Sequence, residues 1–121
     1  MFLSRTNNKS KGNQAEDLAC EHLIKHKVKI LERNFRNRSG EIDIIAMEAN
    51  TLLFIEVKFR SGQSHGFAVE SVTPLKQQKI IRTAEFYLQK NAKLAGNDCR
   101  FDVISIDNNK LNWLKNAFDA N

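Results

Sequence analysis

Residues 51–59 constrain the fold more than any other part of the sequence. They contain the uninterrupted apolar run Leu52-Leu53-Phe54-Ile55, and residues 48–50 before it turn the chain back. A short apolar run of this kind is typical of a strand that is buried on both faces. We therefore predict that residues 51–59 form a central strand of a β-sheet.

Hydrophobic periodicity and turn residues predict two helices and four further strands around this one. The first helix is expected over residues 13–27, with Asn13 as its N-cap. The second begins at Thr73-Pro74, with threonine as the N-cap and proline at the first helical position, and ends near residue 90. The other strands are expected over residues 29–36, 41–47, 100–106 and 111–114. The order α-β-β-β-α-β-β predicts an α/β fold with a central mixed sheet flanked by helices.

The length of 121 residues suits one domain with one core. Residues 1–11 are polar and lack periodicity, so we expect a flexible basic N-terminal arm, followed by a single domain over residues 12–121. No apolar run approaches the ~20 residues that span a bilayer. The start of the chain is too quickly polar for a signal peptide. We therefore expect no membrane partner and a cytoplasmic location.

The two cysteines, Cys20 and Cys99, lie far apart, and without a secretion signal they are expected to be reduced and largely buried thiols. No CxxC or HExxH spacing occurs, so a zinc site is not expected. His22 and His26 are four residues apart on the first helix. Two such histidines without a third ligand are more often ordinary surface or core residues than metal ligands.

A pair of acids next to a lysine carries the main functional signal. Glu56 and Lys58 are two residues apart in a strand, so they share one face of the sheet. If the preceding strand pairs with theirs through a turn at residues 48–50, Asp43 falls opposite Glu56. Two carboxylates on half-buried strands repel each other and lose hydration. Mg²⁺ would relieve this, since it prefers carboxylate oxygens and keeps bound waters. One such water could attack a phosphodiester, with Lys58 orienting it or stabilising the transition state.

Three further residues are candidates for the same site, each with a structural alternative. Glu16 lies on the apolar side of the first helix, where it could contact the metal or a water, or complete a capping box with Asn13. Gln77 lies on the sheet-facing side of the second helix and either reaches the site or caps the helix end. Glu41 shares a strand face with Asp43 and is a secondary carboxylate. By contrast, Asp102 is expected to be a structural partner of a basic residue.

The net charge of +5 favours polyanionic partners. Six basic residues are expected to grip phosphates without reading bases: Arg33, Arg36, Arg38, Arg60, Lys76 and Lys79.

The acidic motif resembles that of a known superfamily. The segments Gly40-Glu41-Ile42-Asp43 and Phe54-Ile55-Glu56-Val57-Lys58 resemble the PD-(D/E)xK, or restriction-endonuclease-like, nucleases. Over nearly its whole length the chain resembles the YraN-like family of small bacterial proteins. That likeness includes Gly12 with Glu16, Asn34-Phe35-Arg36, residues 40–46 and 56–60, residues 71–74 with Lys76, and residues 100–103.

The superfamily resemblance implies an αβββαβ core and Mg²⁺-dependent phosphodiester cleavage. It assigns metal binding to Asp43 and Glu56 and the role of catalytic lysine to Lys58. In the Holliday-junction resolvases of this superfamily an upstream helical glutamate joins the site, and Glu16 matches it. The proline of the motif is absent, since Ile42 precedes Asp43, but this removes no ligand.

Together these observations favour a Mg²⁺- or Mn²⁺-dependent nuclease that acts on DNA rather than RNA. Branched or structured DNA is a candidate substrate by analogy alone. The Val57 carbonyl is a further candidate metal ligand, and a homodimer would supply two sites for cutting both strands. The alternatives are a non-catalytic nucleic-acid-binding module that retains the nuclease fold, and a protein-interaction subunit whose acids are structural.

Overall fold

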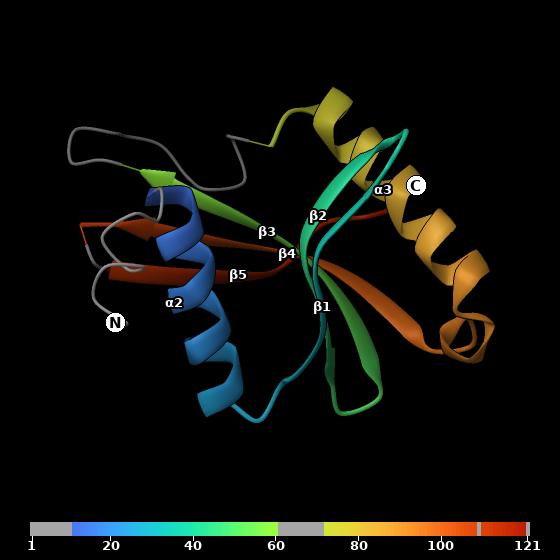
Figure 1. Cartoon of the computed structure of the whole chain (residues 1–121), viewed down its shortest axis with the longest axis horizontal. Coiled ribbons are helices and arrows are strands. Elements are labelled where there is room, and N and C mark those ends of the chain that lie inside the picture. Colours follow the sequence, from blue (N-terminus) through green and yellow to red (C-terminus); the bar gives the residue numbers. More distant parts are fainter. Residues whose placement is uncertain (1–10, 61–71, 109, 121) are drawn as a thin grey trace, which may run out of the picture.

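The computed structural model describes residues 11–60, 72–108 and 110–120, without the side chains of residues 11 and 60. The elements, in chain order, are α2 (Lys11–Lys25), β1 (Lys29–Asn37), β2 (Gly40–Glu48), β3 (Thr51–Arg60), α3 (Pro74–Lys90), the short 3-10 helix η2 (Ala92–Leu94), β4 (Asp98–Asp107) and β5 (Lys110–Phe118) (Figure 1). Both predicted helices and all five predicted strands are present. None of the described helices is long and apolar enough to cross a membrane.

The five strands form one mixed sheet in the order β1-β2-β3-β4-β5. Only β3 and β4 are parallel, and the chain between them contains α3, as a parallel pair requires a crossover. The remaining neighbours are antiparallel. The predicted α/β fold with a mixed sheet is therefore confirmed, and the order of elements is compatible with an αβββαβ core. The strand β3 is the middle strand, as its apolar run predicts.

The two long helices cover opposite faces of the sheet (Figure 1). Alternate residues of β3 pack into two separate cores. Leu53 and Ile55 pack with the apolar side of α2, while Leu52 and Phe54 pack with that of α3. The next residue on the α3 side of this strand is Glu56, so the position of α3 determines what this carboxylate can meet.

The start of α3 follows the sequence prediction. The Thr73 side chain accepts a hydrogen bond from the backbone N–H of Lys76 at 3.2 Å, and Pro74 occupies the first turn. This cap satisfies an N–H group that the helix leaves without a partner. It also fixes the first turn of the helix, which carries Lys76.

Several local predictions were wrong. The helix α2 already includes Lys11, which the sequence assigned to the arm, so Asn13 lies inside the helix and is not its N-cap. Strand alternation predicts that Phe59 points into the core on the same side as Ile55 and Val57, but it is exposed, because the α2-side core of β3 ends at Val57. Both cysteines are free thiols, but only Cys20 is buried; Cys99 is exposed near the start of β4. The rest of the proposed arm, residues 1–10, lies outside the described residues.

The strand β1 deviates from regular alternation, as its sequence indicates. Its pairing with β2 shifts between Ile30 and Glu32, so that Leu31 is an extra residue on β1. Such a bulge twists an edge strand and interrupts its pattern of inward and outward residues.

Asp102 is confirmed as a structural residue. Its fully buried carboxylate accepts two hydrogen bonds from Arg100, one from the Trp113 indole N–H and one from the Asn116 backbone N–H, all at 2.9 Å. The last two donors belong to β5, so this carboxylate joins β5 to β4 where their register shifts. A buried anion with this many donors has replaced the water it lost on folding.

Candidate metal centre

The hairpin of β2 and β3 brings Asp43 and Glu56 together. Its register runs from Glu48–Thr51 at the turn to Ile44–Ile55, which places Asp43 opposite Glu56 at the next position. The alternation of β2 breaks at this point, since Ile42 packs in the α3-side core whereas Ile44 packs in the α2-side core. The two acids therefore lie at the end of the paired part of the hairpin, as the sequence predicts.

A backbone hydrogen bond fixes the Asp43 side chain. The Val57 N–H donates to Asp43 Oδ2 at 2.8 Å, in the place where a carbonyl of β2 would accept in a regular ladder. One carboxylate oxygen is thus held against β3. This contact uses the N–H group of Val57, whereas the sequence suggested its carbonyl as a metal ligand.

Two ammonium groups contact the carboxylate of Glu56. Lys58 Nζ lies 3.4 Å from Glu56 Oε2, which agrees with the predicted shared strand face. Lys76 Nζ, from the first turn of α3, forms an ion pair with the same oxygen. The sequence placed Lys76 among the phosphate-binding residues and missed this contact. A signal was available, because Lys76 precedes the buried Ile80 by four residues and so lies on the sheet-facing side of the helix.

The surroundings of Asp43 favour its neutral form. Burial raises the pKa of this carboxyl group to about 8, and the charge of Glu56 and a side-chain hydrogen bond with Glu56 act in the same direction. The hydrogen bond from the Val57 N–H lowers the pKa of Asp43, but by less than the other effects raise it. At neutral pH the metal-free protein therefore holds a proton on Asp43.

The two lysines are shifted in opposite directions. Burial and the neighbouring Lys76 ammonium lower the pKa of Lys58, although Glu56 opposes this. Burial also disfavours the charged form of Lys76, but its contacts with Glu56 and Lys58 outweigh burial and raise its pKa. Both ammonium groups thus share Glu56, and the contact with this carboxylate favours the charged form of each lysine.

These groups line a pocket of about 300 Å³ between the hairpin and α3. Its lining consists of Gly40, Glu41, Asp43, Glu56, Val57, Lys58, Lys76, Lys79 and Ile80. Gly40 suits this position because its φ of +154° is rarely adopted by other residues, whereas a Cβ atom there would make only van der Waals contact with Thr83 Oγ1, at 3.4 Å.

Glu16 approaches the acid pair from the α2 layer. Its charge contributes to the raised pKa of Asp43, which indicates proximity. Arg33 Nη2 lies 3.6 Å from Glu16 Oε1, a distance too long for a hydrogen bond. This buried oxygen has no hydrogen-bond partner in the described part of the chain. The capping-box alternative fails because Asn13 is inside the helix.

The secondary candidates lie in different places. Glu41 lines the pocket, and its carboxylate is 3.3 Å from Arg36 Nε in an ion pair. The Gln77 amide donates to the Val72 carbonyl at 3.0 Å and does not line the pocket. Gln77 therefore holds the start of the helix to the residues before it, and its side chain does not reach the acid pair.

The predicted phosphate-binding residues are also dispersed. Arg33 forms a 2.9 Å ion pair with Asp17, so its charge is already compensated within the protein. Arg38 and Lys79 are exposed, and Lys79 lies at the rim of the acid pocket. The side chain of Arg60 lies outside the description.

No three His, Cys, Asp or Glu side chains within residues 11–60, 72–108 and 110–120 are gathered into a ready-made metal cage.

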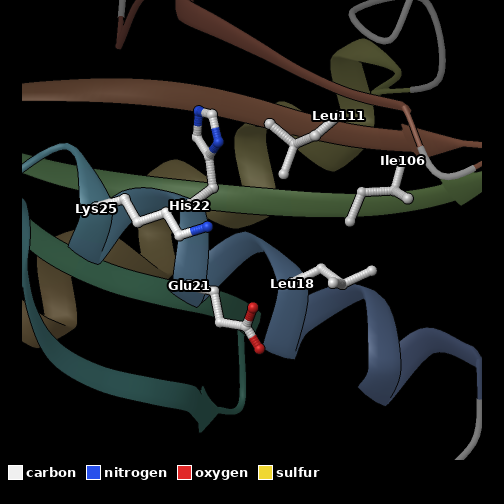
Figure 2. A pocket seen from close by; sticks show the side chains of 6 residues that line it. All are labelled: Leu18, Glu21, His22, Lys25, Ile106 and Leu111. Atoms are coloured by element: carbon white, nitrogen blue, oxygen red, sulfur yellow. The ribbon is translucent and has the colours of Figure 1, made fainter.

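A second hollow, of about 180 Å³, lies on the other side of the sheet between α2 and the strands β4 and β5 (Figure 2). It is lined by Leu18, Glu21, His22, Lys25, Ile106 and Leu111. The rings of His22 and His26 lie 4.2 Å apart, and His22 also packs edge-on against Trp113. The His26 Nδ1 atom is 2.8 Å from the His22 carbonyl oxygen, so the pair is held by packing and a backbone contact.

The fold and the pocket define a class: an α/β domain whose central hairpin presents an acid pair and a lysine beneath the first turn of a helix. Comparison of sequences then gives the family. Residues 15–106 match the model of the "Uncharacterised protein family UPF0102", and the chain belongs to this family. This agrees with the likeness to YraN-like proteins, and the matched span contains Glu16, Asp43, Glu56, Lys58 and Lys76.

Relatives match along almost their whole length. A UPF0102 protein of Persephonella marina is 48% identical over 109 residues, which cover 90% of this chain and 93% of the relative. One of Saccharophagus degradans is 44% identical over 110 residues, covering 91% and 93%. One of Pseudomonas paraeruginosa is 39% identical over 122 residues, covering 96% and 98%.

Proposed function

We propose that this protein is a Mg²⁺- or Mn²⁺-dependent nuclease that hydrolyses phosphodiester bonds of DNA. The observation that carries the proposal is the position of Asp43 and Glu56, which lie opposite each other in a pocket beside Lys58. The PD-(D/E)xK resemblance assigns the same three residues to metal binding and catalysis. DNA, rather than a small phosphate ester, is proposed because of the net charge of +5 and the basic rim of the pocket.

The residues present suit a divalent cation. Burial favours the neutral form of Asp43, and Glu16 Oε1 is a buried acceptor without a hydrogen-bond partner among the described residues, so a cation would lower the cost of ionising these carboxyl groups. Asp43 and Glu56 would hold the cation. When bound, it supplies an activated water and neutralises phosphate charge. The Val57 N–H fixes one Asp43 oxygen, Lys58 stabilises developing negative charge, and Glu16 orients the attacking water from the α2 side.

The surface beside the pocket suits a nucleic-acid strand. A hollow of about 340 Å³ is lined by Phe35, Asn37, Arg38, Phe86 and Lys90. Phe86 lies seven residues after Lys79 on α3, which is about 10 Å at 1.5 Å per residue. Phe86 is 44% exposed and offers a face on which a base could stack. Arg38 and Lys90 line the same hollow and could contact the phosphates of a nucleotide next to the cleavage point.

The second candidate is a nucleic-acid-binding module that does not cleave. The contacts of Glu56 with Lys58 and Lys76 favour it, because two ammonium groups neutralise this carboxylate without any metal. In that case the acid pair stabilises the fold and only the basic surface acts.

One assay distinguishes the two candidate functions. Wild type, Lys58→Ala and Glu56→Gln are incubated with linear, single-stranded, flapped and four-way DNA, and with matched RNA, in Mg²⁺ or Mn²⁺. We expect metal-dependent cleavage of DNA that falls by about 10²–10³ in Lys58→Ala, while DNA affinity in Ca²⁺ is largely retained. Cleavage of both strands of a duplex would support a homodimer, which sedimentation would test.

Binding by wild type without cleavage of any substrate, with either metal, would support the binding module. Equal cleavage by wild type and both variants would identify a contaminating nuclease and would also contradict the proposal.

A further inference from the structure

We infer that Lys76 is a displaceable counter-ion of the metal site: its ammonium group occupies Glu56 until a divalent cation replaces it, and the released side chain then contacts the substrate phosphate. This inference rests on the proposed function, since it assigns a role to Lys76 at the same site.

The first step is the contact itself. Lys76 Nζ and Lys58 Nζ both approach Glu56 Oε2, and the Glu56 side chain is only 8% exposed. Most of the compensation for this buried charge thus comes from two lysines on different elements.

The second step is which lysine can leave. Lys58 lies two residues from Glu56 on the same strand, so its backbone is fixed relative to the carboxylate, and its side chain is 24% exposed. Lys76 reaches in from α3 on a flexible four-carbon stem and is 40% exposed. Its Nζ can swing to solvent without any change in the backbone, which the Thr73 cap holds in place.

The third step is competition. A Mg²⁺ ion binds carboxylate oxygens at ~2.1 Å, so on either oxygen of Glu56 it would lie within a few ångströms of the ammonium group that Lys76 places on Oε2. An ammonium group that stayed there would repel the ion strongly at such short range. Binding of the cation and the Lys76–Glu56 ion pair therefore oppose each other, and each must weaken the other by the same factor.

The fourth step concerns the released side chain. Lys76 and Lys79 line the same pocket one helical turn apart. A phosphate entering that pocket would meet both ammonium groups, and lysine binds phosphate as a point charge. Lys76 would then neutralise Glu56 in the metal-free protein and a phosphate of the substrate once the metal is bound.

Calorimetric titration of the protein with Mn²⁺ tests the exchange without any need for activity. Lys76→Met keeps the length of the side chain and removes its charge. Lys79→Met is the matched control, because Lys79 lines the same pocket but has no ion pair among the described residues. We expect Lys76→Met to bind Mn²⁺ about tenfold more tightly than wild type, Lys79→Met to bind as wild type, and Lys76→Met to bind DNA more weakly.

Mn²⁺ binding by Lys76→Met that equals or falls below that of wild type would overturn the inference and leave the metal site intact. Absence of Mn²⁺ binding by both proteins would overturn the metal site and the inference together. If Lys76→Met does not fold, NMR of the lysine side-chain nitrogens in wild type decides: Mg²⁺ should move the Lys76 signal towards that of an exposed lysine. An unmoved signal at Mg²⁺ saturation contradicts the exchange.

Discussion

Asp102 and Asp43 are both aspartates on interior strands of one sheet, and they differ in how many donors they meet. Asp102 accepts four hydrogen bonds, from Arg100, Trp113 and Asn116. Asp43 accepts one from the Val57 N–H and otherwise faces Glu56, and its pKa is raised to about 8. A carboxylate with a full set of donors stabilises the fold, whereas Asp43 meets one donor and a second acid, so ionising it costs free energy. In the proposed metal site a bound cation would offset that cost.

The largest effect is expected from removing the well-bonded acid. Asp102→Ala should lower the free energy of unfolding by about 2–4 kcal/mol, because it leaves the Trp113 indole N–H and the Asn116 backbone N–H without their acceptor, while Arg100 keeps its ion pair with Glu48. Urea unfolding followed by circular dichroism measures this. A loss below ~1 kcal/mol would mean that its four hydrogen bonds contribute little, and the contrast with Asp43 would not hold.

The opposite result is expected at Asp43 in metal-free protein. Its carboxyl group is protonated in the folded state up to a pH of about 8, but in the unfolded state only up to about 4. The free energy of unfolding should therefore fall as the pH rises between these values, since folding takes up a proton there.

Asp43→Asn removes this dependence. At pH 8 with EDTA, the variant should be more stable than wild type by at least ~1.4 kcal/mol, the equivalent of one pKa unit, and the difference should shrink towards pH 4. Parallel pH profiles for the two proteins would show that Asp43 is not destabilised when ionised.

The smallest effect is expected at the hollow beside the acid pocket. Phe86→Ala should weaken binding of a single-stranded oligonucleotide about fivefold, because it removes a stacking face. Ile24→Ala, at another exposed apolar residue on the opposite side of the sheet, is the control and should leave affinity unchanged. Fluorescence anisotropy gives both values. An equal loss in the two variants would remove Phe86 from the DNA surface.

The sequence predicts the acid pair well because its geometry is local. Glu56 and Lys58 share a face through strand periodicity alone, and the turn before Thr51 sets the register that brings Asp43 opposite Glu56. Strand β3 as the middle strand follows from its apolar run for the same reason. Asp102 was also predictable, since Arg100 lies two residues away on the same face.

Contacts between distant elements were not predictable in this way. The Lys76–Glu56 ion pair depends on how α3 lies over β3 after a long connection, and local patterns do not fix that placement. Arg33 was interpreted as a phosphate-binding residue, but its partner Asp17 lies on α2, sixteen residues earlier. Counting charges along a sequence cannot distinguish a cation that faces solvent from one that is already paired.

The most direct test of the account is Mn²⁺ binding by wild type and Asp43→Asn, measured by calorimetry at one pH above 8, where the proton on Asp43 no longer competes. The account predicts one bound Mn²⁺ per wild-type chain and a loss of affinity of tenfold or more in Asp43→Asn, because the cation loses one of two carboxylate ligands. Glu41→Gln, at the carboxylate paired with Arg36 in the same pocket, should bind as wild type. Equal Mn²⁺ affinity in wild type and Asp43→Asn would contradict the claim that these acids form a metal site.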